Sequence, residues 1–253
     1  MKKQNLFQED FLDCIEEVNL EGLDELDFDL DFEGNVEKDL CIQGFLVSVP
    51  RKFADVPKSK IKAQNAVPLA KQLAALTEED TFVNVLIPGN FVFCDLLEAL
   101  AVELGGDIEI DIGTLSYSYE NVDTFRRMFA NGAMRRLSLV ISDYFYAHER
   151  RSAYRYTLES LPLKQTDIAV AGLHCKIHLL KDKAGNKYVL EGSANLRSSQ
   201  NVEQFVFTKS AAAYDFHKEW LQQLLDKYSV IQKEKQKTPR GDALWSEIMN
   251  PKK

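Results

Sequence analysis

The chain has 253 residues, of which 45% are hydrophobic and 28% are charged. This length and composition are typical of a globular protein with one or two domains, and they exclude a disordered or fibrous chain. The formal net charge of −8 is uneven, because residues 1–40 hold 14 acidic and 3 basic side chains and leave 25 acidic and 28 basic ones for the rest. The acidity therefore belongs to the first segment, and the body of the chain is slightly basic.

The sequence shows no sign of export or membrane insertion. Met1–Asn5 leads into acidic residues and not into an apolar core, so we expect no signal peptide. There is no run of 18 apolar residues, so we expect no transmembrane helix and no membrane partner. The four cysteines lack C-x-x-C spacing and fit reduced thiols, which predicts a cytoplasmic protein.

Residues 1–45 form an acidic N-terminal arm. Apolar residues follow helical spacing over Leu6–Val18, and Leu26–Phe32 then alternates apolar and acidic residues as an amphipathic strand does. We favour a strand that docks on the body with its acidic face in water. The alternative is an anionic lid over a nucleic-acid-binding cleft, in which case removal of residues 1–40 raises activity.

Residues 46–79 are predicted to form a connector and a helix. Ile42–Val49 resembles a short strand, and Ala66–Leu76 has helical periodicity beyond a basic connector. Residues 233–253 form a basic tail, whose short apolar segment Ala243–Met249 is expected to dock on the same chain. Binding of that segment to another protein is the alternative.

Residues 80–232 are predicted to alternate strands and helices. The predicted strands are Phe82–Ile87, Asp107–Ile112, Arg136–Ser142, Ile168–Ala171 and Val202–Phe207, and the helices are Phe91–Leu104, Val122–Ala130 and Ser210–Ser229. A hairpin with its turn at Ala184–Asn186 precedes the last strand. This order predicts an α/β fold with a mixed β-sheet flanked by helices.

The predicted hairpin carries chemically active side chains at regular spacing. His174 and Lys176 lie two residues apart, and Ser193 and Asn195 repeat that spacing beyond the turn. Residues two apart in a strand share a face, at roughly 6.6–6.8 Å. We therefore expect an imidazole, an ammonium, a hydroxyl and a carboxamide to converge on a phosphate-sized anion, with Cys175 turned to the other side.

Together with Gly192 and Glu203, this pattern resembles the signature of the phospholipase D superfamily: H-x-K, an Asp four residues later, G-S-x-N and a downstream Glu. Two features depart from it. Lys181 stands at the Asp position, with Asp182 one residue later, and the interval to Gly192 is a few residues longer than the short form. The resemblance implies a phospholipase D-like sandwich with one motif per chain, in which a longer hairpin absorbs the extra residues.

The resemblance also implies a mechanism. His174 is the nucleophile that attacks phosphorus and forms a phosphohistidine. Lys176, Asn195 and Ser193 stabilise the charge on the non-bridging oxygens. Glu203 orients the imidazole from its far ring nitrogen, within the chain or across a dimer. No cofactor and no metal are required.

The chain holds one copy of the motif. His148 has no Lys two residues later, and His217 lies in the predicted last helix. Single-motif members of the superfamily, such as Nuc-type endonucleases, build one site from two copies. The resemblance therefore implies a C2 homodimer in which the partner's His174 protonates the leaving group.

Three other interpretations of the motif stay open. The first is that the pattern is a chance match. The second is that the chain is a pseudoenzyme that keeps the fold for binding. The third is that His174, Cys175 and His178 bind zinc. The zinc site is disfavoured because the two imidazoles lie roughly 13 Å apart along a strand and Cys175 faces the opposite way.

The substrate class follows from charge. Candidate phosphate contacts are Arg126, Arg127, Arg135, Arg136 and Arg197. Ordinary solvated faces are the alternative for these arginines. We expect a nuclease first, then a lipid or small-molecule phosphodiesterase of the same fold, then a catalytically silent dimeric nucleic-acid-binding protein. A lipid enzyme would carry an apolar helix, an exposed loop or a targeting segment, and none is evident.

Overall fold

The computed structural model describes residues 58–62, 65–88, 90–199, 201–231 and 240–250. The chain divides into two units, Met1–Ser48 and Val49–Lys253, and the described residues all belong to the second. The predicted features of the acidic arm, the strand over Ile42–Val49 and the polar part of the tail therefore lie outside them. None of the helices in these ranges is long and apolar enough to cross a membrane.

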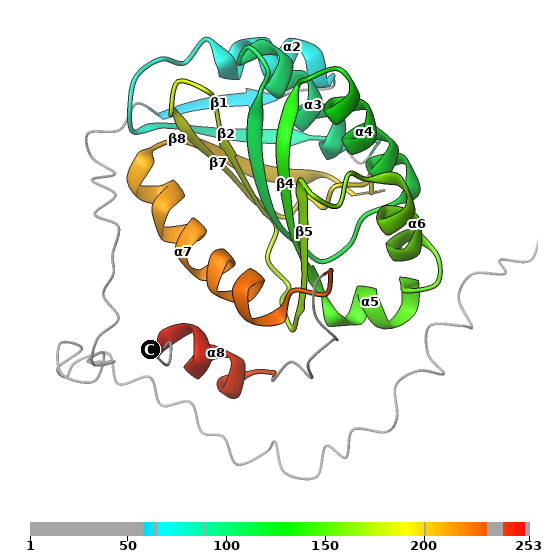
Figure 1. The fold of residues 1–253 in the computed structure, drawn as a ribbon. Coiled ribbons are helices and arrows are strands. Elements are labelled where there is room, and N and C mark those ends of the chain that lie inside the picture. Colours follow the sequence, from blue (N-terminus) through cyan, green and yellow to red (C-terminus); the bar gives the residue numbers. More distant parts are fainter. Residues whose placement is uncertain (1–57, 63–64, 89, 200, 232–239, 251–253) are drawn as a thin grey trace, which may run out of the picture. The chain divides into compact units, whose positions relative to one another are not determined.

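In the described part of the chain, eight strands form one mixed sheet in the order β1-β2-β8-β7-β6-β3-β4-β5 (Figure 1). The strands are β1 (Lys58–Lys62), β2 (Thr81–Ile87), β3 (Ile108–Thr114), β4 (Met134–Ser142), β5 (Thr166–Ala171), β6 (Ile177–Lys181), β7 (Lys187–Gly192) and β8 (Glu203–Lys209). Strands β6 and β8 pair antiparallel with their neighbours and run opposite to the other six. The predicted α/β fold with a mixed sheet is confirmed.

Helices cover both faces of this sheet. They are α2 (Ala66–Ala74), α3 (Phe93–Glu103), α4 (Tyr119–Ala130), α5 (Asp143–Glu149), α6 (Ala153–Ser160), α7 (Ala211–Tyr228) and α8 (Asp242–Met249). The larger core lies between the sheet and helices α2, α3, α4 and α6, while α7 packs on the opposite face (Figure 1). Leu244 of α8 is buried with residues of α7, so the apolar segment of the tail docks on its own chain.

The strand directions bring seven strand ends to one edge of the sheet. Strands β2, β3, β4, β5 and β7 end there, and β6 and β8 begin there. The neighbours in register near this edge include Gly113 and Ile177, Thr114 and Ile141, and Ile177 and Glu191. The segments that contain the H-x-K and G-S-x-N residues both extend from this edge, which we call the motif edge.

A histidine is buried in the larger core close to that edge. His178 of β6 is 1% exposed, its ring centroid lies 4.5 Å from that of Phe93, and its Nδ1 donates to the carbonyl oxygen of Leu190 over 3.3 Å. Burial lowers the pKa of His178 to about 4, and the hydrogen bond to Leu190 opposes that shift only in part. The folded chain therefore holds this imidazole neutral.

We expect His178 to make the protein less stable in mild acid. The unfolded chain binds a proton at this residue below about pH 6.5, whereas the folded chain does so only near pH 4, so the free energy of unfolding falls as the pH drops between these values. The expected loss is about 3 kcal/mol at pH 4. Urea unfolding at pH 7 and pH 4 measures it, with His178→Phe as the matched variant. An equal loss in both proteins would contradict this account.

Candidate active site

The H-x-K pair lies in the loop that precedes β6, and not within a strand as predicted. Its two side chains nevertheless come together. The ammonium of Lys176 lies 3.3 Å from Nδ1 of His174 and donates to the carbonyl oxygen of His174 over 3.1 Å. His174 is exposed and Lys176 is half-buried. The imidazole is thus open to solvent, with a cation directly beside it.

Cys175 points away from this pair, as expected. A side chain added at Gly113 would place its Cβ 3.1 Å from the sulfur of Cys175 and 3.3 Å from Leu221 of α7, so the thiol lies on the α7 face of the sheet. Burial raises the pKa of Cys175 to about 11. Within the described ranges, no group of three His, Cys, Asp or Glu side chains is placed to hold a metal ion.

The second half of the motif is joined to the first by the backbone. The amide of Gly192, the last residue of β7, donates to the carbonyl oxygen of Lys176 over 3.3 Å, and the amide of Ser193 donates to Gln204 over 2.9 Å. Gly192 has ordinary φ, but an added Cβ would lie 2.6 Å from Cα of Phe205 and closer still to the carbonyl oxygen of Gln204. Glycine is therefore required here by the close approach of β8.

Glu203 is held by serines. Its carboxylate accepts hydrogen bonds from the hydroxyls of Ser193 and Ser199, the latter over 2.9 Å. Among the described residues, no hydrogen bond joins Glu203 to His174. The carboxylate thus holds the segment that contains Ser193 through hydrogen bonds. That Glu203 orients the imidazole of His174 stays a prediction.

Asn195 is half-buried between two buried neighbours, Ala194 and Leu196. Its Oδ1 atom is buried and accepts no hydrogen bond from any residue in the described ranges. Such an oxygen costs about 1–3 kcal/mol when it is left without a donor. A donor from a bound substrate or from a residue outside the described ranges would remove this cost.

Asn121 is a positioning residue that the sequence reasoning missed. Its Nδ2 donates to the carbonyl oxygen of Leu196 over 3.3 Å, and the same carbonyl accepts from the amide of Cys94 over 3.0 Å. Its Oδ1 accepts from the amide of Ser118 over 2.9 Å and so caps α4. The G-S-x-N segment is thereby docked on the first turns of α3 and α4. A polar residue three positions after Ser118 was the available signal, because it completes a capping box.

Asp182 occupies the turn between β6 and β7. Its carboxylate accepts from the backbone amide of Asn186 over 2.9 Å, from the side-chain amide of Asn186 over 2.7 Å and from the hydroxyl of Tyr188 over 3.4 Å. Lys181, at the position where the signature has Asp, reaches Glu109 at 3.9 Å instead. The longer hairpin therefore places its structural carboxylate one residue later.

Two of the five arginines predicted to bind phosphates lie far from the motif edge. Arg135 and Arg136 stand at the start of β4, six residues or more and about 20 Å before Ser142. They form ion pairs with Glu109 at 2.9 Å and with Asp167 at 2.7 Å. The structure does not bring these two residues to the motif.

The other three arginines differ in their surroundings. Arg126 and Arg127 lie about two turns into α4, where they pair with Asp123 at 3.0 Å and with Glu98 at 2.6 Å. Arg197 directly follows Leu196 and is exposed. Of the five, Arg197 is the one within the motif segment.

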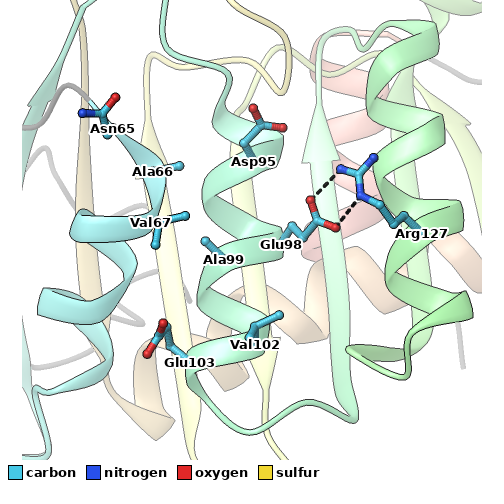
Figure 2. A pocket seen from close by; sticks show the side chains of 9 residues that line it. All are labelled: Asn65, Ala66, Val67, Asp95, Glu98, Ala99, Val102, Glu103 and Arg127. Atoms are coloured by element: carbon cyan, nitrogen blue, oxygen red, sulfur yellow. Dashed lines mark hydrogen bonds and ion pairs between the residues drawn. The ribbon is translucent and has the colours of Figure 1, made fainter.

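A pocket of about 590 Å³ lies between α2, α3 and α4 (Figure 2). Its charged lining consists of Asp95, Glu98, Glu103 and Arg127, and Arg127 is bonded to Glu98. Burial and the neighbouring Glu98 raise the pKa of Asp95. No motif residue lines this pocket, and its carboxylates repel a phosphodiester, so we do not assign it to the substrate.

Substitution of Gly192 by alanine tests the close approach of β8. We expect Gly192→Ala to lower the free energy of unfolding by more than about 3 kcal/mol, the upper end of the usual cost of overpacking, because the atoms in the way are backbone. Gly185→Ala in the turn of the same hairpin is the control. Gly185 has φ +89° and open space around it, so about 1–2 kcal/mol of backbone strain is expected. Equal losses in urea unfolding would show that Gly192 is not sterically required.

A scan against models of protein families and a search of curated proteins found no match. Among solved structures, the chain is similar to Nuc from Salmonella typhimurium, a phospholipase D family member, with 14% identity over 59% of this chain and 97% of that one and a TM-score of 0.44. It is also similar to phosphatidylserine synthase from Haemophilus influenzae Rd KW20, with 13% identity over 61% and 40% of the two chains and a TM-score of 0.43.

A third similar structure is polyphosphate kinase from Porphyromonas gingivalis, with 13% identity over 63% of this chain and 27% of that one and a TM-score of 0.42.

Proposed function

We propose that the chain is a phosphodiesterase that works without a metal and forms a phosphohistidine at His174. The observation that carries this proposal is the junction of the two motif segments, since Gly192 is hydrogen-bonded to Lys176 and Ser193 follows directly. An exposed imidazole, an ammonium and a hydroxyl-bearing turn then lie at one edge of the sheet. These groups match the needs of phosphoryl transfer, which are a nucleophile and positive charges or hydrogen-bond donors close to the phosphate oxygens.

The reaction proceeds in two displacements. The free imidazole nitrogen of His174 attacks phosphorus, the P–O bond to the leaving group breaks, and that oxygen takes a proton from a general acid. Water then attacks phosphorus, gives its proton to the same group, and breaks the P–N bond to release the phosphate. Lys176 and Asn195, joined by Ser193 when its hydroxyl turns from Glu203 to the substrate, stabilise the charge that builds on the non-bridging oxygens in both steps.

The general acid is the partner's His174 in a C2 homodimer. Two other histidines of the chain are unsuited, because His178 is buried and His217 lies on the α7 face, 3.4 Å from Glu191. Trp220 donates to the second ring nitrogen of His217 over 3.2 Å. A two-fold axis near the motif edge would set the two copies of His174 on either side of one phosphorus.

The substrate is a nucleic acid. His174 and Ser193 are exposed and Lys176 is half-buried, so the site is an open edge that suits a polymer lying across the surface. Exposed Arg197 adds positive charge to the motif segment, and the body of the chain is slightly basic.

Removal of the nucleophile is the first test. Wild type should hydrolyse a chromogenic phosphodiester and DNA in EDTA, and His174→Ala should lower that turnover by about 10³-fold or more. His174 is exposed, so the melting temperature should not change. Light scattering on the same samples should give twice 28.8 kDa. Substantial turnover by His174→Ala would refute the assignment, and an active monomer would point to His148, on the helix that follows β4.

Lys176→Ala tests charge stabilisation. Loss of one preorganised donor typically costs about 10²–10³ in kcat, and we expect a fall of that size with a smaller change in KM. Lys181→Ala is the matched control, because Lys181 lies at the far end of β6 and faces Glu109. Similar kcat values for the two variants would mean that Lys176 does not contact the reacting phosphate.

A further inference from the structure

Two exposed aromatic side chains stand at the motif edge. In the described ranges the exposed large aromatic residues are Tyr144 at 63%, Trp245 at 57% and Tyr119 at 45%. Tyr119 is the first residue of α4, which follows β3, and Tyr144 is the second residue of α5, which follows β4 without a gap. Because β3 and β4 end at the motif edge, α4 and α5 begin there. Tyr119 and Tyr144, in the first turns of these helices, therefore lie at the same edge of the sheet as the motif residues.

The strand register sets the separation from the motif. Gly113 of β3 pairs with Ile177 of β6 on one side and with Val140 of β4 on the other. Adjacent strands lie about 4.8 Å apart, which puts the backbones of Ile177 and Val140 about 10 Å from each other. Lys176 directly precedes Ile177, and Ile141 directly follows Val140. Tyr144 follows three residues after Ile141, so a nucleic-acid strand of a few nucleotides can extend from the motif to Tyr144.

The helix that carries Tyr144 is firmly attached at this edge. The hydroxyl of Ser142 donates to the carbonyl oxygen of Leu115 over 2.8 Å and accepts from the amide of Phe145 over 2.9 Å. The ring of Phe145 is buried 4.5 Å from that of Tyr117. These contacts hold the start of α5 in place, so the exposed ring of Tyr144 is attached to a fixed backbone.

The exposed ring also has a supporting partner. The ring of His148 lies 4.3 Å from that of Tyr144, and Nδ1 of His148 donates to the carbonyl oxygen of Tyr144 over 2.7 Å. The helix is followed by Arg150 and Arg151, both exposed. The nearest carboxylate in sequence, Asp143, forms an ion pair with Arg240 at 2.6 Å. Exposed aromatic rings that bases can stack on, together with arginines for the phosphates, are the combination that binds single-stranded nucleic acid.

We propose that Tyr144, supported by His148, is a stacking platform for an unpaired base of a single-stranded nucleic acid whose backbone lies at His174. Tyr119 offers a second exposed ring at the same edge, 5.3 Å from Tyr156. Bases in a duplex already stack on each other, so this platform favours single strands over double strands. The inference rests on the proposed function and names its substrate class.

The test compares a short fluorescent oligothymidylate with an abasic strand of the same length and charge. Binding is followed by anisotropy on the full chain carrying His174→Ala, which prevents hydrolysis. Addition of Tyr144→Ala should weaken binding of oligothymidylate by about 5- to 100-fold and leave the abasic strand unchanged. Tyr144→Phe keeps the ring and should bind as tightly as the parent.

Leu163→Ala is the control, since Leu163 is 40% exposed and precedes β5 at the opposite edge of the sheet. It should change neither affinity. The proposal is overturned if Tyr144→Ala binds oligothymidylate as well as the parent does, or if its affinity for oligothymidylate and for the abasic strand falls by the same factor.

The two hypotheses can fail separately. If wild type hydrolyses no phosphodiester but Tyr144→Ala still loses oligothymidylate selectively, the enzyme assignment fails and the stacking platform stands. If wild type hydrolyses the chromogenic diester and the Tyr144 variants bind both strands as the parent does, the platform fails and the enzyme assignment stands.

Discussion

The candidate site depends on the place of one glycine between two strands. Gly192 ends β7, and its amide is bonded to Lys176 on one side while β8 approaches its α-carbon on the other. Any side chain here would displace β8, and with it the carboxylate of Glu203 that holds Ser193. A shift of β7 by one residue would also turn its alternate side chains to the wrong face. The close contact therefore sets the register of both motif segments at once.

The G-S-x-N segment is held at Leu196 by hydrogen bonds from residues in the first turns of α3 and α4. The first amides of a helix have no partner within the helix and must find one elsewhere. The backbone amide of Cys94 in α3 donates to the carbonyl oxygen of Leu196. The side chain of Asn121 donates to the same carbonyl through Nδ2 and accepts from the amide of Ser118, which caps α4, through Oδ1. The motif thus rests on helices that are themselves buried against the sheet, which is the rigid support that a catalytic group needs.

Alternation and spacing were sufficient to predict much of this architecture. The apolar alternation of Ile108, Ile110 and Ile112 predicted β3, and the H-x-K and G-S-x-N residues are indeed joined across β6 and β7. Helices α5 and α6 were missed because they are short and rich in polar and charged residues. The loop placement of His174 was also missed, since the chain must cross the ends of β4 and β3 to pass from β5 to β6. Such a crossing is invisible without the strand order.

The arginines show a different limit of sequence reasoning. A run of basic residues has the same appearance whether it begins a strand or ends one, yet these positions lie at opposite edges of the sheet. Arg136 is the third residue of β4, and its partner Asp167 lies on β5, 31 residues later in the chain. Long-range ion pairs of this kind cannot be deduced from composition, and they leave less positive charge for a ligand than a count of arginines indicates.

The contact between Lys176 and His174 has a consequence for the proposed chemistry. An ammonium has only donors, so a hydrogen bond from Lys176 to Nδ1 of His174 requires the tautomer that carries its ring proton on Nε2. If phosphorus is attacked from the outer nitrogen, Nε2, that proton must first move to Nδ1, and the ammonium must leave. A phosphate oxygen is the stronger partner for an ammonium, because it is charged. Substrate binding would therefore withdraw Lys176 and make the nucleophilic tautomer of His174 available in the same step.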